Sequence, residues 1–143
     1  MGFGVAEEMK LPWQPELIPD AAWLYLRVHK NQLEHGEPIP GAFRNRPQST
    51  DGMSTDWEKY ATPEACRKRA RTPADNAVIE LTVGDVRAIP WQVVEHTPMY
   101  QPDENPPNIN RAHTDVFGEK RNPEIRLRYL QIYRMVIRVE DPA

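Results

Sequence analysis

Four side chains that can bind metals or transfer protons fall on or beside segments with strand character: His29, His96, His113 and Asp115. Imidazole and carboxylate groups together form a common ligand set for transition metals. His113 and Asp115 are two residues apart, so on a strand they project from the same face. No pair has the short spacing of a recognisable zinc motif. We therefore predict no metal site and interpret the histidines as hydrogen-bonded residues at sheet edges.

Cys66 is the only cysteine, and it precedes the basic residues 67–69. Neighbouring cations lower the pKa of a thiol and favour a nucleophilic thiolate. The cysteine nevertheless falls near the middle of a short expected helix with no histidine close in sequence, which favours a buried apolar role. A single cysteine also excludes an intramolecular disulfide and favours a reducing compartment. Ser49 and Ser54 lack the glycine-flanked turn of a hydrolase serine.

The densest basic cluster is the segment RKRAR, which places Arg67, Lys68, Arg69 and Arg71 on one short helix. On a helix these charges spread around the cylinder, as is typical of a solvated face. The net charge of −3, from 18 basic and 21 acidic residues, also argues against a general affinity for nucleic acid. Nucleic-acid binding through these four residues is kept as a second alternative.

Cofactor and membrane signals are missing from the sequence. It contains no glycine-rich phosphate loop with a Gly-Lys-Ser or Gly-Lys-Thr ending, and we predict no cofactor. No apolar stretch approaches the roughly 18 residues needed to cross a bilayer, and the N-terminus lacks a signal-peptide pattern. We expect a cytoplasmic protein without a membrane partner.

The elements that must position these residues are short, because fifteen prolines and only seven glycines stiffen the connections. Strand patterns of aromatic and branched residues occur at 22–29, 53–57, 76–83, 91–96, 112–117 and 134–140. Helices are expected to start at the capping residues Thr62 and Asn122, each followed by proline. The segment 97–111 holds four prolines in fifteen positions and is expected to be a long loop.

The order of these elements predicts a single α+β domain over residues 21–143, preceded by an N-terminal arm at residues 1–20. We expect a small mixed or mainly antiparallel sheet of five to six short strands, with two helices on one side and long proline-rich loops. Alternation along the strand at 22–29 places Ala22, Leu24, Leu26 and Val28 toward the core. The strand at 76–83 is expected to be central.

Four segments between residues 24 and 120 carry a resemblance: LYLRVH, RPQSTDGMSTD, VGDVRAIPWQVVEHTP and AHTDVFGEK. Together they resemble a group of short bacterial proteins without an assigned activity. In that group a strand ending in arginine precedes an Arg-Pro-Ser region with Met-Ser-Val, an Ala-Gly-x-x-Arg turn and a His-Ala-x-Val-x-Gly strand. Val83 and Thr114 stand where the group has alanine. The resemblance implies a bacterial origin and no particular chemistry.

A second resemblance rests on the order of four residues: Arg27 or His29 on an early strand, then Ser54, then Glu80. This order is similar to that in the ADP-ribosyltransferase superfamily, whose small mixed-sheet folds bind NAD. The resemblance implies that Arg27 anchors a phosphate or ribose and that Glu80 stabilises the positive charge developing at the sugar. Glu80 lacks the Glu-x-Glu or Gln-x-Glu setting of many members. NAD-dependent transfer or cleavage is the enzymatic alternative.

Aromatic and charged residues abound in the chain, while its sequence shows no self-sufficient catalytic constellation. The leading prediction is therefore a non-enzymatic protein-interaction or accessory module of a bacterial multi-protein system, with another protein as its partner. Aromatic side chains contribute much of the binding energy at protein interfaces. The candidate contact residues are Trp57, Tyr60, Trp91 and Tyr100, the last of them within the expected loop at 97–111.

Overall fold

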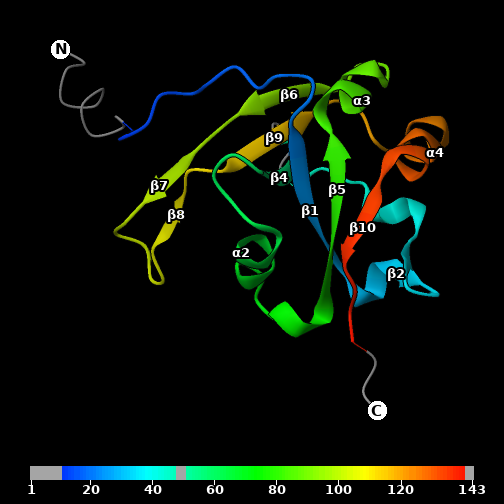
Figure 1. The fold of residues 1–143 in the computed structure, drawn as a ribbon, viewed down its shortest axis with the longest axis horizontal. Coiled ribbons are helices and arrows are strands. Elements are labelled where there is room, and N and C mark those ends of the chain that lie inside the picture. The colour runs from blue at the N-terminus through cyan, green and yellow to red at the C-terminus, as the bar shows by residue number, and fades with distance from the viewer. Residues whose placement is uncertain (1–10, 48–50, 141–143) are drawn as a thin grey trace.

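The computed structural model describes residues 11–47 and 51–140, and its centre is a six-stranded sheet (Figure 1). The strands lie in the order β10-β5-β1-β4-β9-β6, and all neighbouring pairs are antiparallel. They are β1 (Trp23–His29), β4 (Met53–Trp57), β5 (Asn76–Thr82), β6 (Val93–His96), β9 (His113–Phe117) and β10 (Arg134–Ile137). The predicted α+β class is confirmed, and β5 lies inside the sheet, between β10 and β1.

Short elements complete the described part of the chain. Two small hairpins pair β2 (Leu33–Glu34) with β3 (Glu37–Pro38) and β7 (Met99–Gln101) with β8 (Asn108–Asn110). The α-helices are α2 (Pro63–Lys68), α3 (Val83–Ala88) and α4 (Pro123–Ile132), with 3-10 turns at Lys30–Gln32, Pro40–Ala42 and Pro73–Asp75. The predicted caps are present, because Thr62 accepts a hydrogen bond from the amide of Ala65 and Asn122 accepts one from the amide of Glu124.

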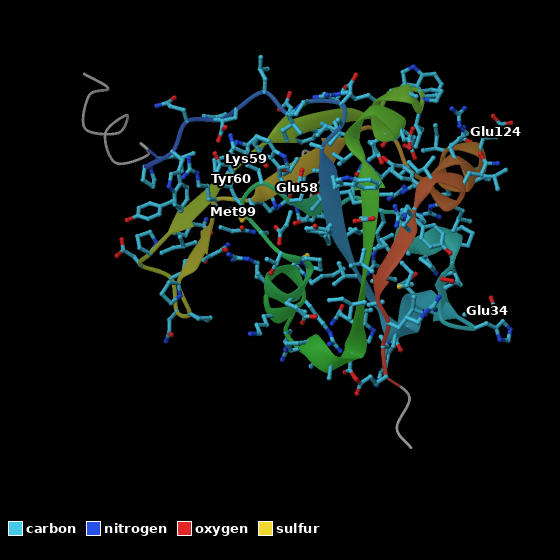
Figure 2. All side chains as sticks on the ribbon, in the orientation of Figure 1. Glu34, Glu58, Lys59, Tyr60, Met99 and Glu124 are labelled. Atoms are coloured by element: carbon cyan, nitrogen blue, oxygen red, sulfur yellow. The ribbon has the colours of Figure 1, made fainter. Side chains whose placement is uncertain are left out.

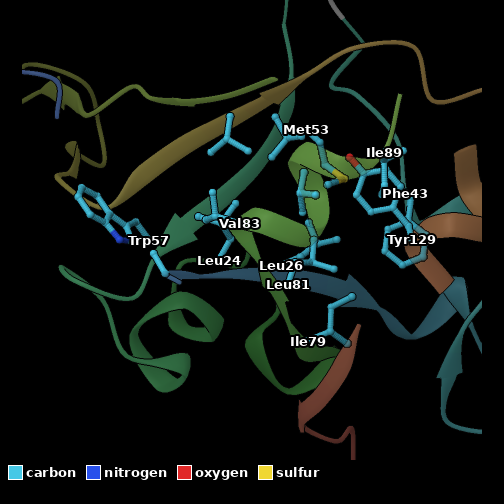
Figure 3. Close-up of a cluster of buried hydrophobic side chains, with 14 of the residues drawn as sticks. Leu24, Leu26, Phe43, Met53, Trp57, Ile79, Leu81, Val83, Ile89 and Tyr129 are labelled. Atoms are coloured by element: carbon cyan, nitrogen blue, oxygen red, sulfur yellow. The ribbon is translucent and has the colours of Figure 1, made fainter. Parts of the chain in front are cut away.

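One face of the sheet carries the hydrophobic core (Figure 3). Leu24, Leu26 and Val28 of β1 are buried there, as the alternation along the strand predicts. Helices α3 and α4 cover this face, and Tyr129 of α4 stacks on Phe43 with ring centroids 5.0 Å apart. The opposite sides of β1 and β4 carry polar residues.

Helix α2 lies on the opposite face of the sheet from α3 and α4. Its Cys66 carbonyl accepts a hydrogen bond from Arg27, which projects from β1 away from the core residues Leu24 and Leu26. The expectation that the helices share one side is therefore wrong. The helix is six residues long with a single buried side chain, Cys66, so it covers only part of that face.

The segment 97–111 is not the loop that its prolines predict, because β7 and β8 form a hairpin there. Met99 pairs with Asn110, Tyr100 with Ile109, and Gln101 with Asn108. The four prolines of the segment all lie outside the two paired stretches, so none removes a hydrogen-bond donor from the ladder. Proline content alone therefore does not predict the structure of this segment.

The described part of the expected N-terminal arm packs against the end of the sheet. Ile18 is buried in the core, and the amide of Glu16 donates to Nδ1 of His96 at 3.0 Å. The carboxylate of Glu16 also binds Lys59 and Tyr60, which are labelled in Figure 2. Residues 1–10 of the arm lie outside the described residues. None of the helices in the described ranges has the length and apolar character needed to cross a bilayer.

Candidate functional site

A cavity of about 910 Å³ opens beside β1 and β4 and is lined by residues 25–29 and 53–56. All residues from 25 to 29 line it, because the ladder between β1 and β4 ends at the pair of Tyr25 with Asp56 and the two strands no longer pair with each other beyond that point. The surrounding walls come from segments 42–47 and 119–121, from Cys66 of α2 and from Arg126 of α4. Its volume falls within the roughly 300–1,000 Å³ typical of small-molecule sites.

Basic side chains outnumber acidic ones around this cavity. The lysines and arginines that line it are Arg27, Arg44, Arg46, Lys120, Arg121 and Arg126, and the acidic lining residues are Asp56 and Glu119. Within the described ranges, Arg27 donates only to the carbonyl oxygen of Cys66 at 2.9 Å and to its sulfur at 3.9 Å. Burial raises the pKa of the Cys66 thiol to about 12, so both acceptors are uncharged. The cavity therefore favours an anion.

Three buried side-chain atoms within residues 11–47 and 51–140 have no hydrogen-bond partner: Gln32 Oε1, Arg46 Nε and Asp56 Oδ2. All three residues line the cavity. Asp56 is only 2% exposed; Asn110 donates to its Oδ1 at 2.7 Å, while the nearest cation to its Oδ2 is Arg69, at 4.0 Å. Buried polar atoms in native proteins are almost always paired. The three residues with unpaired buried atoms therefore surround one cavity.

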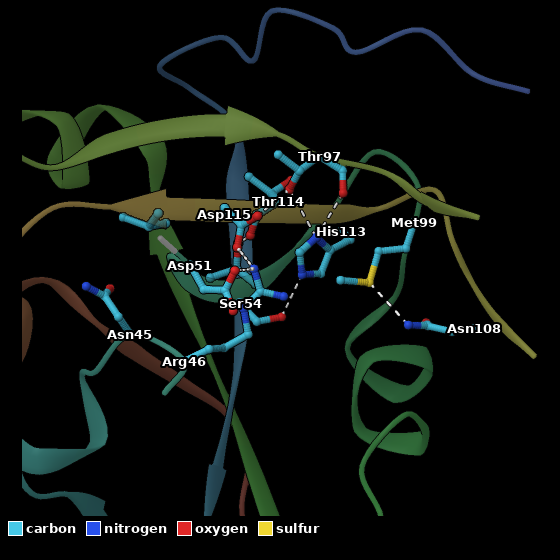
Figure 4. Close-up of polar contacts among 12 residues, drawn as sticks. Asn45, Arg46, Asp51, Ser54, Thr97, Met99, Asn108, His113, Thr114 and Asp115 are labelled. Atoms are coloured by element: carbon cyan, nitrogen blue, oxygen red, sulfur yellow. Dashed lines mark hydrogen bonds and ion pairs between the residues drawn. The ribbon is translucent and has the colours of Figure 1, made fainter. Parts of the chain in front are cut away.

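Beside this cavity, a hydrogen-bonded chain joins Ser54, His113, Thr97 and Asp115 (Figure 4). Nε2 of His113 lies 2.9 Å from the Ser54 hydroxyl, and Nδ1 lies 2.9 Å from the carbonyl oxygen and 3.0 Å from the hydroxyl of Thr97. The Thr97 hydroxyl donates its only proton to Asp115, at 2.9 Å. Both Thr97 oxygens therefore accept from Nδ1–H. The free lone pair on Nε2 faces the Ser54 hydroxyl.

The environment of this chain keeps His113 uncharged. Burial lowers the pKa of His113, and its hydrogen bond to the Thr97 carbonyl and the charge of Asp115 oppose that shift only in part. Arg46 binds Asp115 at 2.8 Å and lies 3.7 Å from Asp51. His113 is 3% exposed, whereas Ser54 lines the cavity. The uncharged imidazole of His113 is therefore buried, and it contacts the hydroxyl of Ser54, which lines the cavity.

The four residues of the enzymatic alternative are not all brought together. Arg27, His29 and Ser54 line the cavity. Glu80 pairs with Tyr25 across β5 and β1, outside the lining residues, and its carboxylate lies 3.6 Å from Arg134. The buried carboxylate at the cavity belongs to Asp56 instead, a residue that sequence reasoning did not select.

The residues considered for a metal site are distributed over several places. His96 accepts from the Glu16 amide through Nδ1 and lies 2.6 Å from the Arg111 carbonyl through Nε2. His29 accepts from the amide of Asn31. Only His113 and Asp115 meet, through Thr97, and no group of three His, Cys, Asp or Glu side chains in the described ranges is arranged to hold a metal ion.

The candidate contact residues differ in exposure. Trp57 is 3% exposed and belongs to the core, where it packs edge-on against Tyr60 and His96, so it is unavailable to a partner. The strand alternation of β4 places it there. Trp91 is 73% exposed and Tyr100 is 42% exposed.

Two of the four basic residues of the helical cluster donate hydrogen bonds to main-chain carbonyls of other segments. Arg67 donates to the carbonyls of Pro73 and Asn76, and Arg69 donates to the carbonyl of Ile109. Lys68 and Arg71 are exposed. The cluster therefore does not act as one free patch of four cations.

Comparison of the chain with family models, curated proteins and solved structures gave no match. The function is therefore argued from the site alone. Sequence reasoning missed the pairing of Ser54 with His113, although the alternation within MSTDW and HTDVF places Ser54 with Asp56, and His113 with Asp115, on one face of each strand. The register of the two strands, which pairs Ser54 with Asp115, was the missing information.

Proposed function

We propose that the chain binds a small phosphate-bearing molecule in the cavity over β1 and β4. The observation that carries the proposal is the set of three unpartnered buried atoms around one cavity. Arg46 Nε offers a donor, whereas Gln32 Oε1 and Asp56 Oδ2 accept. The ligand must therefore combine an anionic group with hydrogen-bond donors.

Phosphate is the anion that these cations suit best. A guanidinium group presents parallel N–H donors that match two phosphate oxygens, and such charge-assisted bonds are stronger than neutral ones. Arg27 and Arg46 reach the cavity from two sides, from β1 and from segment 42–47. A sugar hydroxyl or an amino group would supply the donors that Asp56 and Gln32 lack. These features together fit a molecule of the nucleotide class.

Calorimetric titration with ADP, pyrophosphate and adenosine tests this proposal. ADP and pyrophosphate are expected to bind, and adenosine to bind more weakly, because only the first two meet the arginines. Arg27→Gln removes a charge-assisted bond of about 1.5–3 kcal/mol and should weaken ADP binding roughly tenfold or more. Arg128→Gln is the matched control, because Arg128 is exposed and does not line the cavity.

The outcome against the proposal is equally defined. If neither ADP nor pyrophosphate binds the folded protein, or if Arg27→Gln and Arg128→Gln bind them as the wild type does, the cavity is not a phosphate site. Circular dichroism of each variant shows whether it has folded, since Arg27 also anchors the carbonyl of Cys66.

Use of NAD by an ADP-ribosyltransferase-like mechanism is a second candidate, favoured by the presence of Arg27, His29 and Ser54 around one cavity. Incubation with NAD should then release nicotinamide. Glu80→Gln abolishes the release if Glu80 stabilises the sugar cation, whereas Asp56→Asn abolishes it if the carboxylate at the cavity does so. Absence of nicotinamide from the wild-type reaction would rule out this use of NAD.

Binding of another protein stays a prediction, supported by the exposed aromatic rings of Trp91 and Tyr100. An exposed tryptophan is a frequent anchor of protein interfaces. Co-purification from the native host should recover a stoichiometric partner that Trp91→Ala loses. Purification of the protein without any partner would count against this role.

A further inference from the structure

The Ser54 hydroxyl directs its proton away from the cavity. Nδ1 of His113 carries the ring proton, because it faces two acceptors on Thr97. Nε2 is therefore an acceptor, and the Ser54 hydroxyl donates to it across 2.9 Å. The lone pairs of the serine oxygen are left for whatever occupies the cavity that Ser54 lines.

We propose that Ser54 is the nucleophile of a phosphoryl-transfer reaction and that His113 is its general base. This inference rests on the proposed phosphate site and names its substrate class, a phosphate ester or anhydride. A nucleophile in hydrogen-bond contact with a base that a third group orients is the arrangement that activates a serine hydroxyl. Here the third group is Thr97, which Asp115 in turn holds.

The reaction balances with these groups and water. The Ser54 oxygen forms a bond to phosphorus as its proton passes to Nε2 of His113. The bond from phosphorus to the leaving oxygen breaks, and the imidazolium returns the proton to that oxygen. Water then attacks the phosphorus of the phosphoserine as a proton of the water passes to Nε2 of His113. The bond from phosphorus to the Ser54 oxygen breaks, phosphate leaves, and the imidazolium returns the proton to the Ser54 oxygen.

Two arginines line the same cavity as the reacting oxygen. Arg27 lies on β1 two residues beyond Tyr25, where the ladder with β4 has ended and the cavity opens. Across the ladder between β4 and β9, Ser54 pairs with Asp115, which binds Arg46 at 2.8 Å. Cations around the cavity neutralise the negative charge of the phosphoryl oxygens, and such electrostatic stabilisation is the main source of catalysis in phosphoryl transfer.

Covalent labelling with diisopropyl fluorophosphate tests the nucleophile directly. The reagent transfers a phosphoryl group to an activated serine, and intact mass with peptide mapping should find one adduct, at Ser54. Ser54→Ala should lose it. His113→Asn should slow labelling about 100-fold or more, the usual contribution of a general base. The Asn amide nitrogen stands near the position of Nδ1 and can still donate to Thr97, so this variant removes the base and keeps its contact.

The pH dependence of labelling adds a readout that a structural role would not change. Labelling should speed up as His113 loses its proton, with a midpoint below 6.5 because burial lowers its pKa. The charged groups that face His113 are Asp115 on its own strand, Asp56 on β4 and Arg46 from segment 42–47, while Arg69, beyond α2, reaches Asp56. β6 and the residues that follow it contribute the uncharged Thr97 at this contact.

Each outcome decides the proposal. An adduct at Ser54 that His113→Asn slows and that pyrophosphate blocks supports it. Absence of the adduct from folded wild-type protein, or equal labelling of wild type and His113→Asn, overturns it. If His113→Asn does not fold, Thr97→Val replaces it: the hydroxyl that connects the imidazole to Asp115 is lost while the main-chain carbonyl still accepts from Nδ1, and labelling should slow several-fold. Pyrophosphate binding without labelling would retain the phosphate site and reject the nucleophile.

Discussion

Gly118 packs against the main-chain oxygen of Trp91, where the chain leaving β9 passes the turn before β6. Its φ of +122° lies in a region that side chains rarely adopt, and an added Cβ would overlap the Trp91 carbonyl and stand 2.8 Å from the side-chain nitrogen of Gln92. The next residues, 119–121, form one wall of the cavity. Residue 118 therefore connects β9 to the segment that lines the cavity, and its close contact with Trp91 requires a glycine there.

Gly118→Ala should destabilise the protein by about 1–3 kcal/mol, because the backbone must leave its conformation or the turn at Trp91 must move. Gly41→Ala is the matched control, since its Cβ would meet only the end of the Gln32 side chain, at 3.2 Å. Urea unfolding of both variants gives the comparison. A Gly118→Ala variant as stable as Gly41→Ala would contradict the close packing against Trp91.

A buried hydrogen bond ties α4 to the turn before β6. Tyr129 donates to Oε1 of Gln92 at 2.6 Å, and Gln92 donates to the carbonyl of Glu119 at 2.9 Å. Tyr129→Phe leaves Oε1 buried without a partner and should cost about 1–3 kcal/mol of unfolding free energy. Tyr133→Phe, which loses a half-buried bond to Glu37, should cost less. Chemical denaturation of the pair measures the difference, and equal losses would refute the role of burial.

The sheet could largely be predicted from local pattern. The alternation of β1 and β5 places Leu24 and Ile79 in the core, and the Thr62 and Asn122 caps mark where α2 and α4 begin. These features depend on residues that are neighbours in sequence, so the periods of strand and helix are sufficient to find them. The β7–β8 hairpin was missed because its strands are only three residues long.

The candidate site could not be assembled in this way, because it depends on strand order and register. Ser54 and His113 are 59 residues apart, and they meet only because β9 pairs with β4. Arg46 lies in a segment without regular structure and reaches Asp115 across 69 residues. Single-strand alternation predicts which face each residue occupies, but the neighbour across the sheet follows from tertiary pairing alone.

Cys66 should be inert toward thiol reagents in the folded protein. Its side chain is 1% exposed, and burial raises its pKa to about 12, so almost no thiolate exists at pH 8. Reaction with Ellman's reagent at pH 8 should proceed only as the protein unfolds and become fast in 6 M guanidinium. Rapid labelling of the folded chain would show that α2 opens readily from the sheet.

Lys120 carries a buried amine whose partners are all uncharged. Its Nζ donates to Oδ1 of Asn45 at 2.6 Å and to the carbonyls of Val116 and Gly118 at 2.7 and 3.1 Å. Burial lowers its pKa from 10.5 to about 8, against the opposing charges of Glu119 and Asp115. An uncharged amine keeps two N–H donors, so most of these contacts survive deprotonation.

The sign of the resulting pH dependence follows from which state holds the proton. Below pH 8 Lys120 is charged in both states, and the folded state bears the cost of burying that charge. Above pH 8 the folded protein releases the proton while the unfolded chain retains it, so unfolding free energy rises with pH, by at most about 1.4 kcal/mol per pH unit.

Urea unfolding at pH 7, 8, 9 and 9.5 should therefore show wild type gaining stability relative to Lys120→Met. A constant difference between the two would mean that the amine stays charged in the fold. The series stops below pH 10 because burial also raises the pKa of Tyr129, so the unfolded chain alone would lose that proton and stability would fall.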